Sequence, residues 1–303
     1  MTLAPGMHVF ERGWLSSNCI LFDDGDRSWL VDSGYATHSD QTLALLASKL
    51  GARSLNFLIN THLHSDHCGG NAALQAQYPS LVTIIPPGQS ELVKIWDDFG
   101  LFYTPTGQLC PQFKFDLTLK VGSTIQLGLQ NWEIHAAGGH DPNAIIIFEP
   151  LSRVLISADS LWQSGFGVIF PELEGIEAFD DVAVTLDLIE RLNPRVVVPG
   201  HGGVFKYTPD ILAIARKKLD DFVKDPTKLA RHGAKVLLKF KLLEKQKLLL
   251  SEFIEWAAGT PCLVQYQRRF FANLDFNLWV QQLCEELIVA GVARREGNNL
   301  FNQ

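Results

Sequence analysis

Short apolar segments alternate with amphipathic ones along the first two thirds of the chain. Residues 18–23 and 28–32 are rich in apolar side chains, and the Asp24-Gly25 dipeptide between them is typical of a tight turn, so this stretch predicts a β-hairpin. Residues 39–51 follow with a helical pattern that a glycine ends. A chain in which strands and helices alternate in this way is typical of an α/β fold.

The alternation continues as far as the segment that ends in "PGHG". We expect helices at residues 69–78 and 175–193, and further strands at residues 55–60, 81–86, 123–130, 132–137, 143–150, 153–159 and 195–199. Residues 88–113 interrupt this order, because aromatic residues and prolines occur there without a single period. This segment is either a lid over a binding site or a loop that packs on the surface through its own aromatic side chains.

The character of the chain changes after Thr208. Threonine and proline stand at the start of the next helical pattern, where both are favourable. We expect helices at residues 208–225, 251–259 and 275–292, helical structure between the first two of these, and a hairpin at residues 292–301. Helices followed by a hairpin are the order of a winged-helix module. We therefore divide the chain into a main domain, residues 1–208, and a mainly helical, winged-helix-like region, residues 209–303.

The composition is that of an ordinary globular protein. The chain has 303 residues, of which 47% are hydrophobic and 19% are charged, which is enough apolar material for a core. Its apolar runs are shorter than the roughly 18 residues of a membrane helix, and its first residues lack the pattern of an export signal. The five cysteines are scattered and form no CxxC pair, so we expect a reduced, cytoplasmic protein.

Charge is unevenly distributed along the chain. The formal net charge is −7, yet residues 216–247 contain eleven Lys or Arg and four Asp or Glu, a balance of +7 that leaves −14 for the rest. An acidic body disfavours indiscriminate binding to nucleic acid. The basic stretch keeps nucleic-acid binding open, although a solvated helical face is the preferred interpretation.

A segment rich in histidine follows the strand expected at residues 55–60. His62, His64, Asp66 and His67 lie within six positions. In an extended loop, residues i and i+2 point to the same side, so His62 and His64 can bind one metal ion together. Asp66 and His67 are adjacent and are expected to point elsewhere, towards a second ion. Two glycines follow and permit close approach of the backbone.

Two metal ions need more than four ligands, and the ends of later strands provide them. His140, Asp159 and His201 each follow an apolar segment, and both histidines stand beside glycine. Imidazole and carboxylate groups suit zinc, but they also suit iron and manganese. Asp159 is the candidate for a carboxylate that bridges the two ions. The alternative is a chance collection of polar residues with no shared role.

These seven residues, in this order, resemble the ligands of the metallo-β-lactamase superfamily. The "LVDSG" segment at residues 30–34 and the "PGHG" segment at residues 199–202 are similar as well, and the resemblance covers roughly residues 8–207. It implies an αββα sandwich with the site at one edge of the two sheets. It also implies one metal bound by His62, His64 and His140 and a second bound by Asp66, His67 and His201, with Asp159 between them.

The resemblance further implies a hydrolase. Two divalent ions, zinc before iron or manganese, would hold a bridging hydroxide at neutral pH that attacks a small, anionic ester, thioester or lactone. Asp66 would transfer a proton to the leaving group. Asp32 would accept a hydrogen bond from a ligand histidine and orient its ring, unless it serves only as a turn residue before Gly34.

Two other functions stay open at this point. The superfamily contains phosphodiesterases and ribonucleases, and the C-terminal region is similar in order and length to the winged-helix tail of the β-lactamase-like protein 2 group, which includes endoribonucleases. A regulator that binds nucleic acid and senses a ligand at its metal site is a non-enzymatic alternative. The segment "AAGGHDPN" at residues 136–143 departs from the glyoxalase II pattern, which weakens a glutathione-thioester assignment. Self-association is also left open.

Four residues close to the expected ligands are candidates for the lining of a substrate pocket. Asn143, Trp162, Phe166 and Tyr207 each follow one of those ligands within a few positions. Asn143 could instead serve a turn. The three aromatic residues could instead belong to the core.

Overall fold

The predicted hairpin lies inside a six-stranded sheet in the computed structural model, which describes residues 3–303. The sheet runs in sequence order and comprises β1 (Met7–Phe10), β2 (Cys19–Asp23), β3 (Ser28–Val31), β4 (Phe57–Ile59), β5 (Val82–Ile85) and β6 (Leu117–Thr118). The first three strands pair antiparallel, and β3 to β6 pair parallel. The loops after β3 and β4 therefore start at the same edge of the sheet.

A second six-stranded sheet has the order β12-β11-β10-β9-β8-β7. Its strands are β7 (Thr124–Leu127), β8 (Gln130–Ala136), β9 (Ile145–Glu149), β10 (Val154–Ala158), β11 (Val196–Pro199) and β12 (Phe205–Lys206). β10 and β11 pair parallel, while β8, β9 and β10 alternate in direction. β8, β10 and β11 consequently end at one edge, and each of the three later candidate ligands follows one of them.

The two sheets pack face to face and share an apolar core. Ile20 and Phe22 of β2 point into this core, where they join Ile147 and Val198 of the second sheet. The alternate residues Cys19 and Leu21 of β2 point the other way, into a cluster between the sheet and the helices α1 (Ser39–Leu50) and α3 (Asn71–Gln77). This alternation follows from the period of two along a strand.

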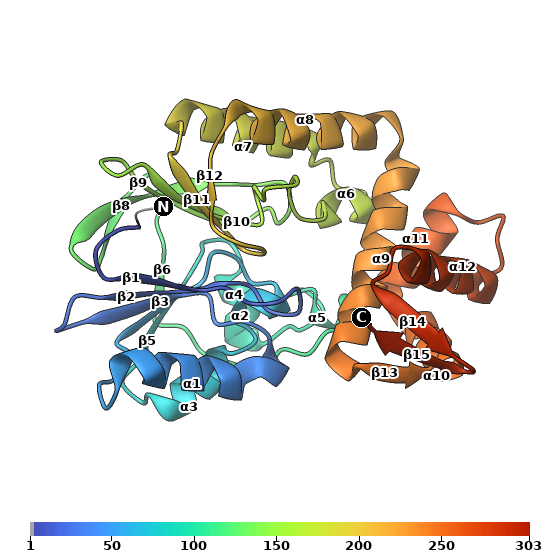
Figure 1. The fold of residues 1–303 in the computed structure, drawn as a ribbon, viewed down its shortest axis with the longest axis horizontal. Coiled ribbons are helices and arrows are strands. Elements are labelled where there is room, and N and C mark those ends of the chain that lie inside the picture. Colours follow the sequence, from blue (N-terminus) through green and yellow to red (C-terminus); the bar gives the residue numbers. More distant parts are fainter. Residues whose placement is uncertain (1–2) are drawn as a thin grey trace.

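Helices also cover the outer face of the second sheet. Leu155 of β10 points away from the inner core and packs with residues of α7 (Phe179–Leu192) and α8 (Pro209–Lys224). Figure 1 shows the resulting order of layers, with α7 and α8 above the sheets and α1 and α3 below them. The αββα prediction is confirmed. α8, which the sequence assigned to the C-terminal region, lies beside α7 and also contacts α9 (Pro226–Lys245).

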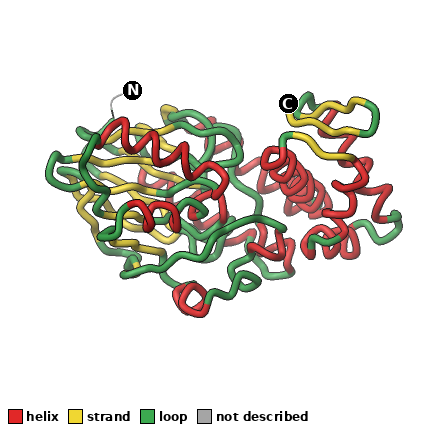
Figure 2. Tube along the Cα trace, turned by 90° about the horizontal axis from the view of Figure 1, so that it is seen from below, coloured by secondary structure: helices red, strands yellow, loops and turns green. Residues whose placement is uncertain are grey.

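The rest of the C-terminal region stands beside the sandwich (Figure 2). Its helices are α9 (Pro226–Lys245), α10 (Leu250–Ala258), α11 (Pro261–Phe270) and α12 (Phe276–Val289). A small sheet has the order β13-β15-β14, formed by β13 (Lys247–Leu249), β14 (Ala293–Glu296) and β15 (Asn299–Asn302). The mainly helical character and the final hairpin are confirmed, while the winged-helix assignment and the boundary at residue 208 stay predictions.

Residues 88–113 connect the two parts of the molecule. They contain α4 (Ser90–Ile95) and α5 (Tyr103–Thr106), and α5 packs against α11. Trp96, Tyr103 and Phe113 pack with Cys68 of the histidine-rich segment. The segment is therefore packed through its own aromatic residues and is tied to both regions. The remaining short helices are the 3-10 helix η1 (Ala36–His38), α2 (Ser65–Cys68) and α6 (Phe170–Glu174).

None of the helices formed by residues 3–303 has both the length and the apolar character that crossing a membrane requires.

Candidate metal centre

The histidine-rich loop follows β4 and is held in place by buried amide side chains. Asn60 Nδ2 donates to the carbonyl of His67 at 3.1 Å, and Asn71 Nδ2 donates to Asn60 Oδ1 at 2.7 Å. The loop passes so close to its neighbours that Gly70 is required, because a Cβ there would lie 2.5 Å from the carbonyl oxygen of Ser33. This packing fixes the backbone from which the first four candidate ligands project.

The second sheet brings the other three candidates to the same place. His140, Asp159 and His201 lie just beyond the ends of β8, β10 and β11. Glycines leave room for their side chains. A Cβ on Gly167 would lie 2.5 Å from His140 Nδ1, and one on Gly200 would lie 2.1 Å from Asp159 Oδ1. Seven side chains from two sheets therefore meet at one edge of the sandwich.

The seven side chains form three overlapping groups that could hold metal ions. In each group the candidate ligand atoms lie within 4.8 Å of one another. The groups are His62 with His64 and His140, His62 with His67 and Asp159, and Asp66 with His67 and His201. The first and third groups match the two ligand sets that the family resemblance implies, and the second group links them.

The Asp159 carboxylate lies between the two predicted ligand sets. Its Oδ1 is 3.4 Å from His67 Nε2, and its Oδ2 is 3.4 Å from His140 Nε2 and 3.9 Å from His201 Nε2. His140 belongs to one predicted set, while His67 and His201 belong to the other. A carboxylate in this position faces both, as a bridging ligand must.

Buried ring nitrogens without hydrogen-bond partners mark the centre of the site. Nε2 of His62 and Nε2 of His67 accept or donate no hydrogen bond within residues 3–303. Buried polar atoms are nearly always paired, and leaving one unpaired costs about 1–3 kcal/mol. Imidazole nitrogens and carboxylates converging in this way are the donor set that zinc, iron or manganese binds. The residues thus fit a pair of divalent ions.

Asp32 lies directly behind His67. Its Oδ2 accepts hydrogen bonds from His67 Nδ1 and Thr61 Oγ1, each at 2.7 Å, and its Oδ1 accepts one from the Thr61 amide at 2.8 Å. In the neutral ring, the form that binds metal, the first bond places the proton on Nδ1 and leaves Nε2 free to face the site. Asp32 also has a φ of 59°, a left-handed conformation that is costly for a residue with a side chain. This is the position that the predicted orienting role requires.

The electrostatics keep both central carboxylates ionised. Burial raises the pKa of Asp159, but His67 and His201 outweigh burial and hold that pKa well below its usual range. Burial likewise opposes ionisation of Asp66, but a 3.0 Å contact with His201 Nε2 and the nearby His67 lower its pKa. Ionised carboxylates are the form that binds metal.

The histidines of the site differ in their preferred charge. Burial lowers the pKa of His64 to about 3 and holds the pKa of His62 well below its usual range, so both rings are neutral at pH 7. His67 is the exception. Burial lowers its pKa, but Asp32 and Asp159 outweigh burial and raise that pKa well above its usual range. A positive charge is therefore favoured between these two carboxylates, which contact opposite nitrogens of the His67 ring.

A cavity of about 510 Å³ opens beside the candidate ligands, and one of the four predicted lining residues reaches it. Trp162 lines the cavity, and its Nε1 donates to Asp159 Oδ1 at 3.3 Å. The other three lie elsewhere. Phe166 is buried in the core, Tyr207 packs against that core, and Asn143 directs its amide towards Gly88. Closeness in sequence to a ligand did not determine which way these side chains point.

Several residues of the cavity wall were not identified from the sequence. Trp14 stacks on His201, with ring centroids 5.5 Å apart. Phe170 contacts His64 in an edge-on arrangement at 5.4 Å. The wall also includes basic side chains from α8 and α9, among them Lys218 and His232. The basic stretch at residues 216–247 was the feature of the sequence that could have indicated these basic side chains, but a solvated helical face was the preferred interpretation.

Known proteins share both the sequence pattern and the fold. Residues 12–201 match the family described as Metallo-beta-lactamase superfamily. The chain is 25% identical over 247 residues to a hydroxyacylglutathione hydrolase from Brucella anthropi, which covers 80% of this chain and 79% of that protein. A metallo-beta-lactamase family protein from Thermus thermophilus superposes over 100% of both chains with a TM-score of 0.57 and 17% identity. A protein solved in a di-iron-bound form superposes with a TM-score of 0.53 and 23% identity, over 68% of this chain and 96% of the other.

Proposed function

The chain belongs to the metallo-beta-lactamase superfamily of hydrolases, and we propose that it is a dinuclear enzyme that cleaves a thioester, an ester or a lactone. The observation that carries this proposal is the overlap of three ligand groups around Asp159. The similarity to hydroxyacylglutathione hydrolases favours a thioester among the three. A fold shared with the structural neighbours adds nothing about the substrate.

The proposed ligand sets are those that meet in space. His62, His64 and His140 would hold one ion, and Asp66, His67 and His201 would hold the other, with Asp159 between them. When bound, two divalent ions polarise a carbonyl oxygen and lower the pKa of water to about 7. Zinc suits these ligands best, and the donor set also accepts iron or manganese.

Asp66 is the proposed proton carrier of the reaction. Its carboxylate lines the cavity and is ionised, so it can take a proton from the attacking water and give it to the leaving group. The rings of Trp14 and Trp162 pack against His201 beside it. A thiolate leaves with less need of a proton than an alkoxide does, because its conjugate acid has a pKa of about 8.5. Asp66 should consequently matter more for esters than for thioesters.

The basic stretch at residues 216–247 supports a small substrate over nucleic acid. Most of its cations are paired within the protein rather than presented on one open surface. Arg216 pairs with Asp187 and Glu190, Lys217 pairs with Asp221, Arg231 and Lys235 pair with Glu286, and Lys241 and Lys245 pair with Glu244. Paired charges release few counterions on a phosphate backbone. Phosphodiester cleavage and nucleic-acid sensing are therefore secondary candidates.

A reducing compartment is also part of the proposal. All five cysteines are free, including Cys68 and Cys110, whose sulfur atoms lie 3.8 Å apart without a bond. Disulfides persist mainly in oxidising environments. Free thiols at this separation support a cytoplasmic protein.

Metal analysis and a substrate panel test the proposal together. The purified protein, reconstituted with zinc, iron or manganese, should retain close to two ions per chain. The loaded enzyme should hydrolyse acyl thioesters, esters or lactones faster than bis(p-nitrophenyl) phosphate or RNA. Less than one ion per chain would refute the dinuclear site. Cleavage confined to phosphodiesters would overturn the substrate class.

A further inference from the structure

Helix α9 presents one continuous stripe to the cavity beside the metal centre. Its cavity-lining residues are His232, Lys235, Val236, Lys239, Phe240 and Leu243. They are spaced three and four positions apart, so they share one face of the helix. The stripe runs about 16 Å along the axis, from eleven steps of about 1.5 Å. A separate face of α9, which includes Leu237 and Leu238, is buried in the core.

The stripe combines apolar and basic side chains. Val236, Phe240 and Leu243 form an apolar wall, which Leu287 of α12 and Phe170 of α6 extend. Apolar surface of this kind favours a ligand segment of the same character. Away from the candidate metal ligands, the same wall carries three lysines and one glutamate, a balance of +2. The cavity thus suits a molecule with both an apolar part and a negative charge.

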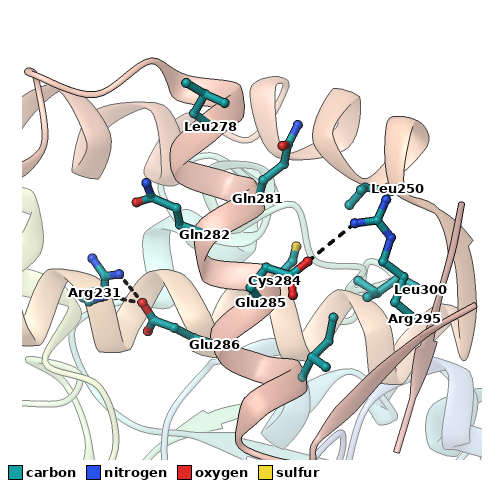
Figure 3. A pocket seen from close by; sticks show the side chains of 11 residues that line it. Arg231, Leu250, Leu278, Gln281, Gln282, Cys284, Glu285, Glu286, Arg295 and Leu300 are labelled. Atoms are coloured by element: carbon teal, nitrogen blue, oxygen red, sulfur yellow. Dashed lines mark hydrogen bonds and ion pairs between the residues drawn. The ribbon is translucent and has the colours of Figure 1, made fainter. Parts of the chain in front are cut away.

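Two of the three lysines are already engaged. Lys239 Nζ donates to the carbonyls of Val292 and Gln303 and to Asn302 Oδ1, which uses its three N–H groups. Lys235 Nζ lies 3.0 Å from Glu286. Glu286 also accepts a hydrogen bond from Arg231, as Figure 3 shows. The one acidic side chain of this part of the wall is therefore occupied by two cations.

Lys218 is different, because it has donors to spare and, unlike Lys235, no carboxylate beside it within the described part of the chain. Its Nζ donates to the Phe166 carbonyl at 2.8 Å, and among residues 3–303 no carboxylate pairs with it. The ammonium group lies 4.9 Å from the ring centroid of Phe166 and 5.7 Å from that of Phe222. An ammonium has three N–H groups, so two remain for a ligand.

The surroundings of Lys218 are shaped to hold its side chain over the cavity. Gly165 has a φ of +127°, and a Cβ there would lie 2.8 Å from Lys218 Cδ. The Phe166 carbonyl that Lys218 holds is next to Gly167, whose amide donates to the Asp159 carbonyl at 2.8 Å. His232 stands beside Phe222 with ring centroids 6.0 Å apart. Burial, with Lys218 and Lys235 nearby, lowers the pKa of His232 to about 3, so its neutral ring can donate one hydrogen bond.

We infer that Lys218 binds an anionic group of the substrate, a carboxylate or a phosphate, while the apolar stripe of α9 holds the part that links this group to the cleaved bond. The inference rests on the proposed hydrolase function and names its substrate class as amphipathic acyl compounds with a remote negative charge. The C-terminal region would then select the substrate, and the metal centre would cleave it.

Matched substrates test this inference in the metal-loaded, full-length enzyme. S-phenyl thioesters of dicarboxylic acids, with a free carboxylate at the far end, are compared with the methyl esters of the same acids. A third series carries a terminal phosphate. The wild-type enzyme should show a higher kcat/KM for the charged series, and the better of the two charged series identifies the anion. A preference for the methyl esters would overturn the inference without any variant.

Lys218→Met assigns the effect to one side chain. The ratio of kcat/KM for charged and methyl-ester substrates should fall by about tenfold, which is the loss expected for a charge-assisted hydrogen bond. Lys217→Met is the matched control, because Lys217 is the next residue on α8, pairs with Asp221 and is exposed. The ratio should stay unchanged in that control. An unchanged ratio in Lys218→Met would remove Lys218 from the site.

A binding measurement separates this inference from the proposed function. Decanedioate, which cannot be hydrolysed, is titrated into wild-type protein and Lys218→Met by calorimetry. Binding to the wild type that weakens in Lys218→Met supports the anion site even if no ester or thioester is cleaved, in which case only the proposed function fails. Thioester cleavage together with absence of decanedioate binding would refute the anion site alone.

Discussion

The cavity has two walls that are built in different ways. The metal side is made of loops that follow strands, and its side chains lie within hydrogen-bond or ligand distance of one another. The opposite side is made of one face of α9 with parts of α8 and α12, and its side chains hold each other through ion pairs and apolar contacts. The first wall has the groups needed to break a bond. The second has apolar and charged groups that could select the substrate.

This difference has a consequence for substitutions. A change on the metal side should reduce turnover of every substrate, because it alters the reacting centre. A change on the α9 side should alter the ranking of substrates, because it alters contacts remote from the cleaved bond. The predictions below use this contrast, beginning with the largest expected effect.

Asp66→Ala should reduce kcat by about 100-fold to 10,000-fold, which is the range for a lost general acid or base. The loss should be larger for esters than for matched thioesters, since the alkoxide needs the proton more. Steady-state kinetics on both series measures it, with metal content recorded in parallel. Asp220→Ala, at an exposed position of α8, is the control. Near-normal turnover by Asp66→Ala would exclude Asp66 from proton transfer.

Asp32→Ala should weaken metal binding by about 10-fold to 100-fold, as loss of a group that orients a ligand histidine typically does. Without Asp32, the Nδ1 proton of His67 loses its acceptor at 2.7 Å and the ring is no longer held. Competition with a chromogenic chelator measures the affinity, and Asp26→Ala, which is exposed, serves for comparison. The ranking of charged and uncharged substrates should not change. A changed ranking would show that the two walls do not act separately.

The preference for charged substrates should depend on pH through Lys218. Burial lowers the pKa of Lys218 to about 8. The side chain is therefore charged below this pH and neutral above it, so the preference should fall by up to about tenfold as pH rises from 7 to 9.5. Lys218→Arg should keep the preference at pH 9.5, because arginine stays protonated. A preference that rises with pH in the wild type would contradict the assignment.

Much of the fold was predictable because its signals are local. The hairpin at β2 and β3, the central strands of both sheets and helices α1, α3, α7, α8, α10 and α12 all occur where the apolar patterns placed them. Helix α11, the short helices α2, α4, α5 and α6, and the edge strands β1, β6, β12 and β13 were not predicted. Edge strands are short and half exposed, so their sequences carry little alternation.

The ligand set was predictable for a similar reason. A spacing of two residues after a strand, as in His62 and His64, already determines which side chains share a side. His140, Asp159 and His201 follow β8, β10 and β11, so they meet the loop after β4 if these three strands end at the same edge of the sandwich. The grouping around Asp159 follows from strand order, which the family resemblance supplied.

The sequence by itself therefore determined most of the strands and helices and the candidate ligands, because strand periodicity and loop spacing act over a few residues, while the layers and the grouping of the ligands came from the family resemblance. Only the tertiary structure decided what the basic stretch faces. Periodicity shows that α9 has a stripe, but the packing of its other face decides whether that stripe meets solvent or a cavity. Tertiary packing likewise decided that Phe166 and Tyr207 pack in or against the core, and that Lys218 of α8 lines the cavity.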